Sequence, residues 1–391
     1  MNQTKSNQCV AERVVEWPPV TSTPSVPLST AHAFCVEYVE IARLESRQKT
    51  SPSHVLGIVR HDRNHGEIRG AGTCPIVYLD LPKLNGPPLA EIWTSTKPVT
   101  YHQAEDIHCA MNGEVLFGAL RVEERPGTQL DTLTYNAYRR LLVQTRGMGY
   151  PHLLRMWNYF PHINHKSDGL ERYQRFCAGR YQALAEDLSG FPRTLPAGTA
   201  VGTLSGPLTI HFLAAKLPGT HIENPRQVRA YEYPSLYGPR SPSFARATLR
   251  PSASGANLFI AGTASVVGHI SAHIDEPHKQ ALEILHNLNA LLTQTERLHG
   301  ITRGEWSGQA LFKIYVRHPE QVLAIRNIFQ GRLPSHAQAL YLQGEMCRRE
   351  LLLEVEGVLD RGSSIDVNRT MSPPPGRLHE PMVSQHEPDR F

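Results

Sequence analysis

Hydrophobic and polar positions follow clear periods in the second half of the chain. Apolar residues recur at helical spacing between Ala281 and Leu292, and they predict a long amphipathic helix. Asp275 is its predicted N-cap, Pro277 lies in its first turn, and Gly300 marks its end. A second helix is predicted from His318 to Phe329. Short apolar or alternating runs predict strands at 257–261, 312–316, 339–346 and 351–358.

This order of elements predicts an α+β fold: a mixed sheet with two helices packed on one face. The first half of the chain repeats the order, which indicates an internal duplication. Its predicted strands are 114–118, 152–160, 199–204 and 208–215, and its predicted helices are 134–145 and 170–184. Further strands are expected at 35–42, 55–59 and 76–81.

Both ends of the chain are polar and rich in proline. Segments of this composition bury too little apolar surface to offset their chain entropy, so disordered tails are expected at 1–33 and 361–391. The folded part is then divided into an N-terminal module, 34–222, and a C-terminal module, 223–360.

Composition excludes several classes of protein. The chain has 391 residues, is 40% hydrophobic and has a net charge of +4, but its Lys and Arg residues do not cluster as they do in proteins that bind nucleic acid. It has no apolar run long enough to span a membrane, no secretory leader and no CxxC pair among its six cysteines, so a reduced cytoplasmic protein is expected. His269 and His273 are four residues apart, but no third ligand has a convincing spacing, so no metal site is expected. The chain also lacks a glycine-rich phosphate loop, and no cofactor is expected.

Six segments form a distinctive set that spans about 150–357: Leu154–Phe160, Glu171–Cys177, Glu223–Gln227, Tyr237–Arg240, Gly262–Ser265 and Cys347–Glu350. Together they resemble the chorismatase family, whose members have two modules related to the YjgF-like (RidA) fold. One departure separates the chain from the simpler YjgF-like deaminases, which have a carboxylate-binding Arg where this chain has the segment Ser335–Ala339.

The resemblance implies an enzyme that removes pyruvate from chorismate. Cleavage of the enol ether needs an acid that remains protonated near neutral pH. Glu354 is the candidate: strand alternation places it on one face with Glu356, although a solvent-facing carboxylate would show the same pattern. Cys347, seven residues before the acid, and Gly262 match the branch that forms 3-hydroxybenzoate, in which the thiol helps the ring to aromatise.

The two carboxylates of chorismate call for guanidinium partners, because Arg offers a planar pair of donors. From their positions in the motifs, Arg240 and Arg172 are the candidate carboxylate ligands and Tyr231 is a candidate hydroxyl donor. Arg155, beside Trp157, is a reserve candidate. Any one of these arginines could instead be a solvated surface charge.

We expect the pocket where the closing strand of the C-terminal module faces the N-terminal module. Because one chain then supplies both walls, a monomer that acts on a small molecule is expected. The alternatives left open are a product mixture that includes 4-hydroxybenzoate, hydrolysis of chorismate to a dihydroxycyclohexadienoate, enamine or imine deamination of the YjgF type, and ligand binding without catalysis.

Overall fold

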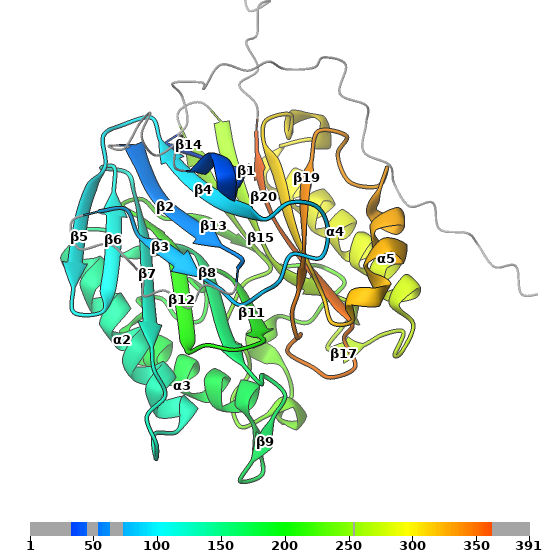
Figure 1. Ribbon diagram of the computed structural model, residues 1–391, viewed down its shortest axis with the longest axis horizontal. Helices are drawn as coiled ribbons and strands as arrows, with labels where there is room; N and C mark the ends of the chain where they lie inside the picture. The colour runs from blue at the N-terminus through cyan, green and yellow to red at the C-terminus, as the bar shows by residue number, and fades with distance from the viewer. Residues whose placement is uncertain (1–32, 45–53, 63–72, 253–254, 362–391) are drawn as a thin grey trace, which may run out of the picture.

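The computed structural model describes residues 33–44, 54–62, 73–252 and 255–361. Both predicted tails lie outside the described residues, apart from Ala33 and Arg361. Two six-stranded sheets and one four-stranded sheet form the body, and the helices lie on the outside (Figure 1). Within the described part, no helix is long and apolar enough to cross a membrane.

The first six-stranded sheet has the strand order β11-β8-β12-β7-β6-β5. Helices α2 (Leu130–Gly147) and α3 (Arg172–Asp187) pack together on one of its faces. The short hairpin β9-β10 (Lys166–Ser167 and Leu170–Glu171) precedes α3. The strands of the sheet are β5 (Thr100–Ala104), β6 (Ile107–Met111), β7 (Val115–Val122), β8 (His152–Pro161), β11 (Ala197–Thr203) and β12 (Leu208–Ala215).

The second six-stranded sheet has the order β13-β14-β15-β20-β18-β19 and carries helices α4 (Pro277–His299) and α5 (Val322–Phe329). A long connection with two 3-10 turns, Ala230–Glu232 and Ser235–Tyr237, joins its first two strands. The hairpin β16-β17 (Val266–Val267 and Ile270–Ser271) follows β15. The strands of the sheet are β13 (Thr220–Ile222), β14 (Ala247–Ser252), β15 (Gly255–Ala264), β18 (Ala310–Val316), β19 (Gln338–Gln343) and β20 (Leu353–Asp360).

The two six-stranded sheets have the same topology. In each, the chain runs strand, strand, strand, helix, strand, helix, strand, strand, and the sixth strand lies between the third and the fourth. The α+β fold of two such modules is therefore confirmed. The sequence patterns did not reveal β5, β6, β13 and β14, which are the first two strands of each sheet.

The four-stranded sheet lies at the start of the predicted N-terminal module, before both six-stranded sheets, and has the order β1-β4-β2-β3. Its strands share one apolar cluster with the faces of both six-stranded sheets that are not covered by helices. Trp93, Trp157 and Phe259, one from each sheet, meet in this cluster. The three sheets thus enclose a common core, and the helices cover two separate outer cores. The strands are β1 (Phe34–Glu40), β2 (Val55–Arg60), β3 (Ile76–Tyr78) and β4 (Leu89–Ser95).

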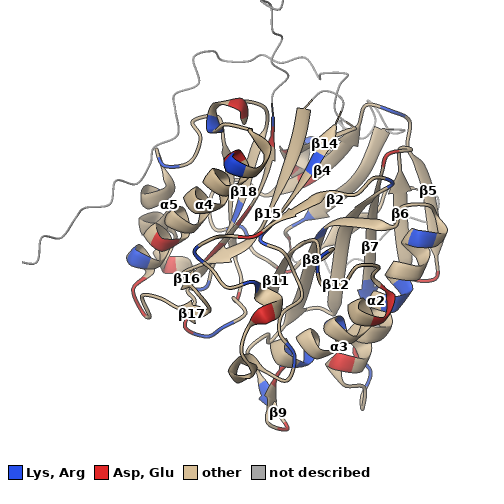
Figure 2. Cartoon of the chain, turned by 180° about the vertical axis from the view of Figure 1, so that it is seen from behind, with Lys and Arg blue, Asp and Glu red and all other residues tan. Residues whose placement is uncertain are grey.

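Helix α4 begins and ends close to the predicted positions. Gly300 caps it in the left-handed conformation (φ 67°), which costs glycine no steric strain. The N-cap is Glu276 and not Asp275, because Asp275 has a positive φ and belongs to the preceding turn. Acidic and basic residues are interspersed over the outer helices (Figure 2).

Candidate active site

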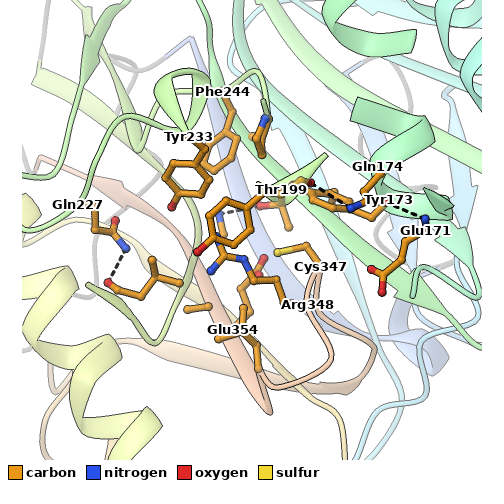
Figure 3. A pocket seen from close by; sticks show the side chains of 18 of the residues that line it. Glu171, Tyr173, Gln174, Thr199, Gln227, Tyr233, Phe244, Cys347, Arg348 and Glu354 are labelled. Carbon is orange, nitrogen blue, oxygen red and sulfur yellow. Dashed lines mark hydrogen bonds between the residues drawn. The ribbon is translucent and has the colours of Figure 1, made fainter. Parts of the chain in front are cut away.

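A cavity of about 300 Å³ lies between β11 of the first module and the second module. Its volume is within the range that holds a small ligand. The walls come from both modules, as expected from the sequence, and Figure 3 shows side chains from distant parts of the chain around one space. The residues used below that line it are Tyr173, Arg180, Thr199, Tyr233, Tyr237, Phe244, Arg246, Gly262, Cys347, Arg348 and Glu354.

Glu354 lies on β20 and points into the cavity (Figure 3). The strand is buried on both faces: Leu353 and Val355 pack under the helices, and Glu354 and Glu356 face the common core. Only 5% of Glu354 is exposed. Burial, and then the negative charge of Glu356, raise the pKa of Glu354 to about 8. Glu354 is thus a protonated acid at neutral pH.

Gly262 leaves the space that the Glu354 carboxyl occupies. A Cβ at this position would lie 2.0 Å from Oε1 of Glu354. The glycine lies where the pairing of β15 with β20 shifts register between Ile260 and Thr263, and such a bulge redirects neighbouring side chains. Its N–H donates to Oγ1 of Thr199 at 3.0 Å, which ties β15 to β11 across the module boundary.

Glu356 is two residues from Glu354 and has the opposite protonation state. Its Oε2 accepts from Arg155 at 2.8 Å, and its Oε1 accepts from Nε1 of Trp157 at 2.9 Å and lies 3.0 Å from Nζ of Lys313. Burial opposes ionisation, but the charges of Lys313 and Arg155 outweigh it and lower the pKa of Glu356 to about 2. Environments that push the pKa values of two carboxyl groups apart are typical of acid–base sites.

Cys347 lines the same cavity from the loop that follows β19. Burial, and then the nearby Glu354, raise the pKa of its thiol to about 12. The side chain is therefore a neutral thiol near neutral pH, and not the thiolate of a cysteine nucleophile. In this form it can donate a proton or a hydrogen bond, or fill space.

Four arginines line the cavity, and two of them are buried, one from each module. Arg180 on α3 is 3% exposed, and its guanidinium forms no hydrogen bond or ion pair with any residue in the described ranges. Arg246, just before β14, is 5% exposed and donates to the hydroxyl of Tyr233 at 2.8 Å and to the carbonyl of Val228 at 3.0 Å. A buried cation without an anionic partner is costly, so the position of Arg180 favours an anionic ligand.

Four residues expected to bind the substrate lie outside the cavity lining. Arg172 is paired with Glu124 and donates to the carbonyl of Pro161 at 3.0 Å. Arg240 is exposed, and its guanidinium lies 4.7 Å from the ring of Tyr181. The other two are Tyr231, which packs against the outer core of the first module, and Arg155, which lies beneath the cavity in the Glu356 network.

The remaining wall is aromatic. The guanidinium of Arg348 lies 3.9 Å from the ring centre of Tyr237 and donates to the carbonyl of His269 at 2.9 Å. The hydroxyl of Tyr237 donates to the same carbonyl at 2.6 Å. Arg348 thus joins the loop that carries Cys347 to the connection between β13 and β14. Tyr173, Tyr233 and Phe244 extend the wall.

Arg180 and Arg246 were not predicted from the sequence to be site residues, but the sequence around Arg180 contains a recognisable pattern. Arg180 follows Phe176 and precedes Leu184 at helical spacing, so it lies on the apolar face of α3, where a charged residue is exceptional. Arg246 gave no comparable signal, because it lies at the entry of a short strand.

Known proteins resemble this chain over most of its length. Residues 91–214 match the family model "Chorismatase FkbO/Hyg5-like, N-terminal". A 3-hydroxybenzoate synthase of Streptomyces hygroscopicus is 37% identical over 280 residues, which cover 70% of this chain and 82% of that protein. A chorismatase of the same organism is 36% identical over 311 residues, 78% of this chain and 89% of that protein.

A solved structure extends the likeness to the fold. The crystal structure of a chorismatase superposes with a TM-score of 0.76 at 32% identity, and the match covers 84% of this chain and 99% of that one. The chain thus shares sequence and architecture with these enzymes over most of its length. It belongs to the chorismatase family.

Proposed function

We propose that the protein converts chorismate to pyruvate and 3-hydroxybenzoate. The observation that carries the proposal is the protonated Glu354 in a cavity that also holds the unpaired guanidinium of Arg180. An acid of this kind is what cleavage of an enol ether needs, and the unpaired cation suits a carboxylate substrate. One of the relatives carries the name 3-hydroxybenzoate synthase.

In this proposal Arg180 and Arg246 bind the two carboxylates of chorismate. They come from different modules, so a diacid would bridge the cavity. Arg246 is already oriented by Tyr233 and the carbonyl of Val228, which reduces the ordering needed on binding. Tyr173, Tyr237 and Phe244 would contact the ring and exclude water.

The proton of Glu354 goes to the methylene carbon of the enolpyruvyl group. The ether bond to the ring then breaks, and pyruvate leaves. The neighbouring ring hydroxyl closes onto the vacated carbon to form an epoxide, and its proton returns to the Glu354 carboxylate. As the epoxide opens, its oxygen takes a proton from a donor, and the ring C–H proton returns to that donor to give the phenol. The atoms of chorismate equal those of the two products, so neither water nor a cofactor is consumed.

Cys347 would act late in this sequence. Its thiol remains protonated, so it can donate to the epoxide oxygen as the ring opens. Gly262 would act by leaving the acid its space. Arg155 would act on the acid without touching the substrate, through its charge and through its hydrogen bonds to Glu356 and Thr199.

The test is to incubate the purified full chain with chorismate and to separate the products by chromatography with mass detection. Pyruvate and 3-hydroxybenzoate in equal amounts are expected, and added 4-hydroxybenzoate would identify a mixed-product enzyme. Pyruvate with a non-aromatic dihydroxy acid would show that the enzyme hydrolyses chorismate and would refute the epoxide route. Folded protein that releases no pyruvate would refute the proposal.

The same cavity supports a monomeric enzyme, because both walls come from one chain. Sedimentation equilibrium of the active protein tests this. A single species with the mass of one chain is expected, and activity confined to a dimer would contradict it.

A further inference from the structure

Glu356 lies at the meeting point of the three sheets. Its partners Arg155 and Trp157 come from β8 of the first module, and Lys313 comes from β18 of the second. Lys313 also pairs with Glu91 of the four-stranded sheet at 2.9 Å, and Glu91 accepts from Nε1 of Trp93 at 2.6 Å. All these side chains are at most 5% exposed. The network therefore fixes a negative charge at one point of the core.

This charge lies next to the acid and outside the cavity. Glu354 and Glu356 are alternate residues on one face of β20, so their positions are about 7 Å apart along the strand. Thr199 links the two: its Oγ1 accepts from Arg155 at 2.5 Å and from the N–H of Gly262 at 3.0 Å. The Glu354 carboxyl occupies the space above Gly262. Substrate cannot reach Glu356, but its field reaches Glu354.

We propose that Glu356 is a positioning residue, whose fixed negative charge keeps the neighbouring Glu354 in its protonated, proton-donating form. The inference rests on the proposed role of Glu354 as the acid and deepens it. Burial alone makes a carboxyl hard to ionise, but two cations near the acid, Arg155 and Arg246, favour its ionised form. A permanent carboxylate at position 356 offsets them. Without it, burial alone would oppose these two cations, and the pKa of Glu354 would be lower.

The other groups that face Glu354 do not replace this charge. Tyr315, its cross-strand partner on β18, is a neutral phenol that shares a hydrogen bond with Tyr159. Cys347 is a neutral thiol. Arg155 from β8 and Arg246 from before β14 carry positive charge. Arg180, Arg348, Arg349 and Glu350 also line the cavity. Among the residues that the structure describes, Glu356 is the one whose negative charge raises the pKa of Glu354.

The experiment is an infrared titration of the free enzyme, which follows the C=O band of the protonated carboxyl group. The Glu354→Gln variant identifies the band, and wild-type protein is expected to lose it with a midpoint near pH 8. In Glu356→Gln the midpoint is expected to fall by about one to two pH units, as two charges about 7 Å apart in a medium of effective dielectric constant ~20 imply. In Arg155→Met the midpoint is expected to rise, because a cation near Glu354 is removed.

A matched control is Asp360→Asn, which removes another buried carboxyl from the same face of β20, about 20 Å from Glu354. It is expected to leave the Glu354 midpoint unchanged. If the network only supports the fold, Glu356→Gln should lower the amplitude of the infrared band or the stability of the protein and leave the titration midpoint unchanged. An unshifted midpoint in folded Glu356→Gln, or shifts of the same sign in Glu356→Gln and Arg155→Met, would overturn the inference.

The titration needs no substrate, so it separates this inference from the proposed function. If wild-type protein shows the predicted midpoint and shifts but does not react with chorismate, the proposed function fails and the role of Glu356 stands. If chorismate is converted but the midpoint does not move, the proposed function stands and the role of Glu356 fails. A second readout is the upper limit of the pH–rate profile, which is expected to move with the midpoint.

Discussion

Arg180 has opposite predicted effects on stability and on substrate binding. In the free protein its guanidinium is 3% exposed and has no anionic partner in the described part of the chain; its neighbours include the rings of Tyr138, 5.4 Å away, and Phe176, 5.9 Å away. Replacement by methionine keeps a similar apolar volume and removes a buried, uncompensated charge. We therefore expect Arg180→Met to increase the free energy of unfolding by about 1–3 kcal/mol, which raises Tm by a few degrees.

Binding is expected to change in the other direction. Truncation of one partner of a buried, hydrogen-bonded charge pair costs about 2–5 kcal/mol, so the Kd for chorismate should increase by a factor of ~30 or more. The measurement is isothermal titration of chorismate into the Glu354→Gln variant with and without Arg180→Met, because turnover would otherwise consume the ligand. Chemical denaturation of the single variant gives the stability.

Arg175 provides a matched control on the same helix. It is also buried, but it donates to the carbonyl of Ser167 at 3.1 Å and to Asp168 at 3.3 Å. Arg175→Met should therefore lower the stability and leave the chorismate Kd unchanged. A destabilised Arg180→Met protein with unchanged affinity would refute the argument from the unpaired charge.

Three further predictions concern the acid, the thiol and the glycine. Glu354→Gln should lower kcat by about 10²–10⁴-fold while chorismate still binds. In the wild type, kcat/KM should fall as pH rises through about 8, because only the protonated carboxyl donates; activity that increases above pH 8 would contradict this. Cys347→Ala should keep the rate of pyruvate release within about tenfold of wild type and lower the share of 3-hydroxybenzoate among the products, because the thiol, with a pKa of about 12, acts as a donor in the later step. Chromatography of the products measures this share, and an unchanged share would contradict the prediction. Gly262→Ala should lower kcat by about 10²-fold at nearly constant Tm, because the new Cβ displaces the Glu354 carboxyl by about 1 Å. The control is Gly147→Ala, which has open space at its Cβ and should keep full activity.

The sequence predicted the elements whose residues repeat with a period. The apolar residues of α4 and the alternation along β20 gave the correct faces, and the latter placed Glu354 and Glu356 side by side. The strands β5 and β14 were not predicted. They are short, and β5 is largely exposed, so their patterns do not differ from those of loops.

The candidate acid was easier to predict than the arginines. A glutamate in an apolar strand is unusual on its own, whereas most arginines in a sequence look alike until their partners are known. Arg172 lies one turn of α3 before Arg175 and two before Arg180, but Glu124, from a distant part of the chain, binds it away from the cavity. Which guanidinium has no partner depends on contacts between segments far apart in the chain, and a local motif does not reveal those contacts.

The shared topology of the two modules has a consequence for how this enzyme can change. In a symmetric oligomer built from one such module, every substitution appears in every copy, so a residue that improves one wall of a pocket also alters the equivalent wall. Here the sixth strand of the second module, β20, carries Glu354, the proposed acid. The sixth strand of the first module, β12, carries the neutral, buried His211 toward the same core. Arg180 could arise in the first module, and Glu354 and Glu356 in the second, because a substitution in one module leaves the other unchanged. Duplication within one chain thus allows the cavity wall that contains Glu354 and the wall that contains Arg180 to evolve, or to be engineered, independently.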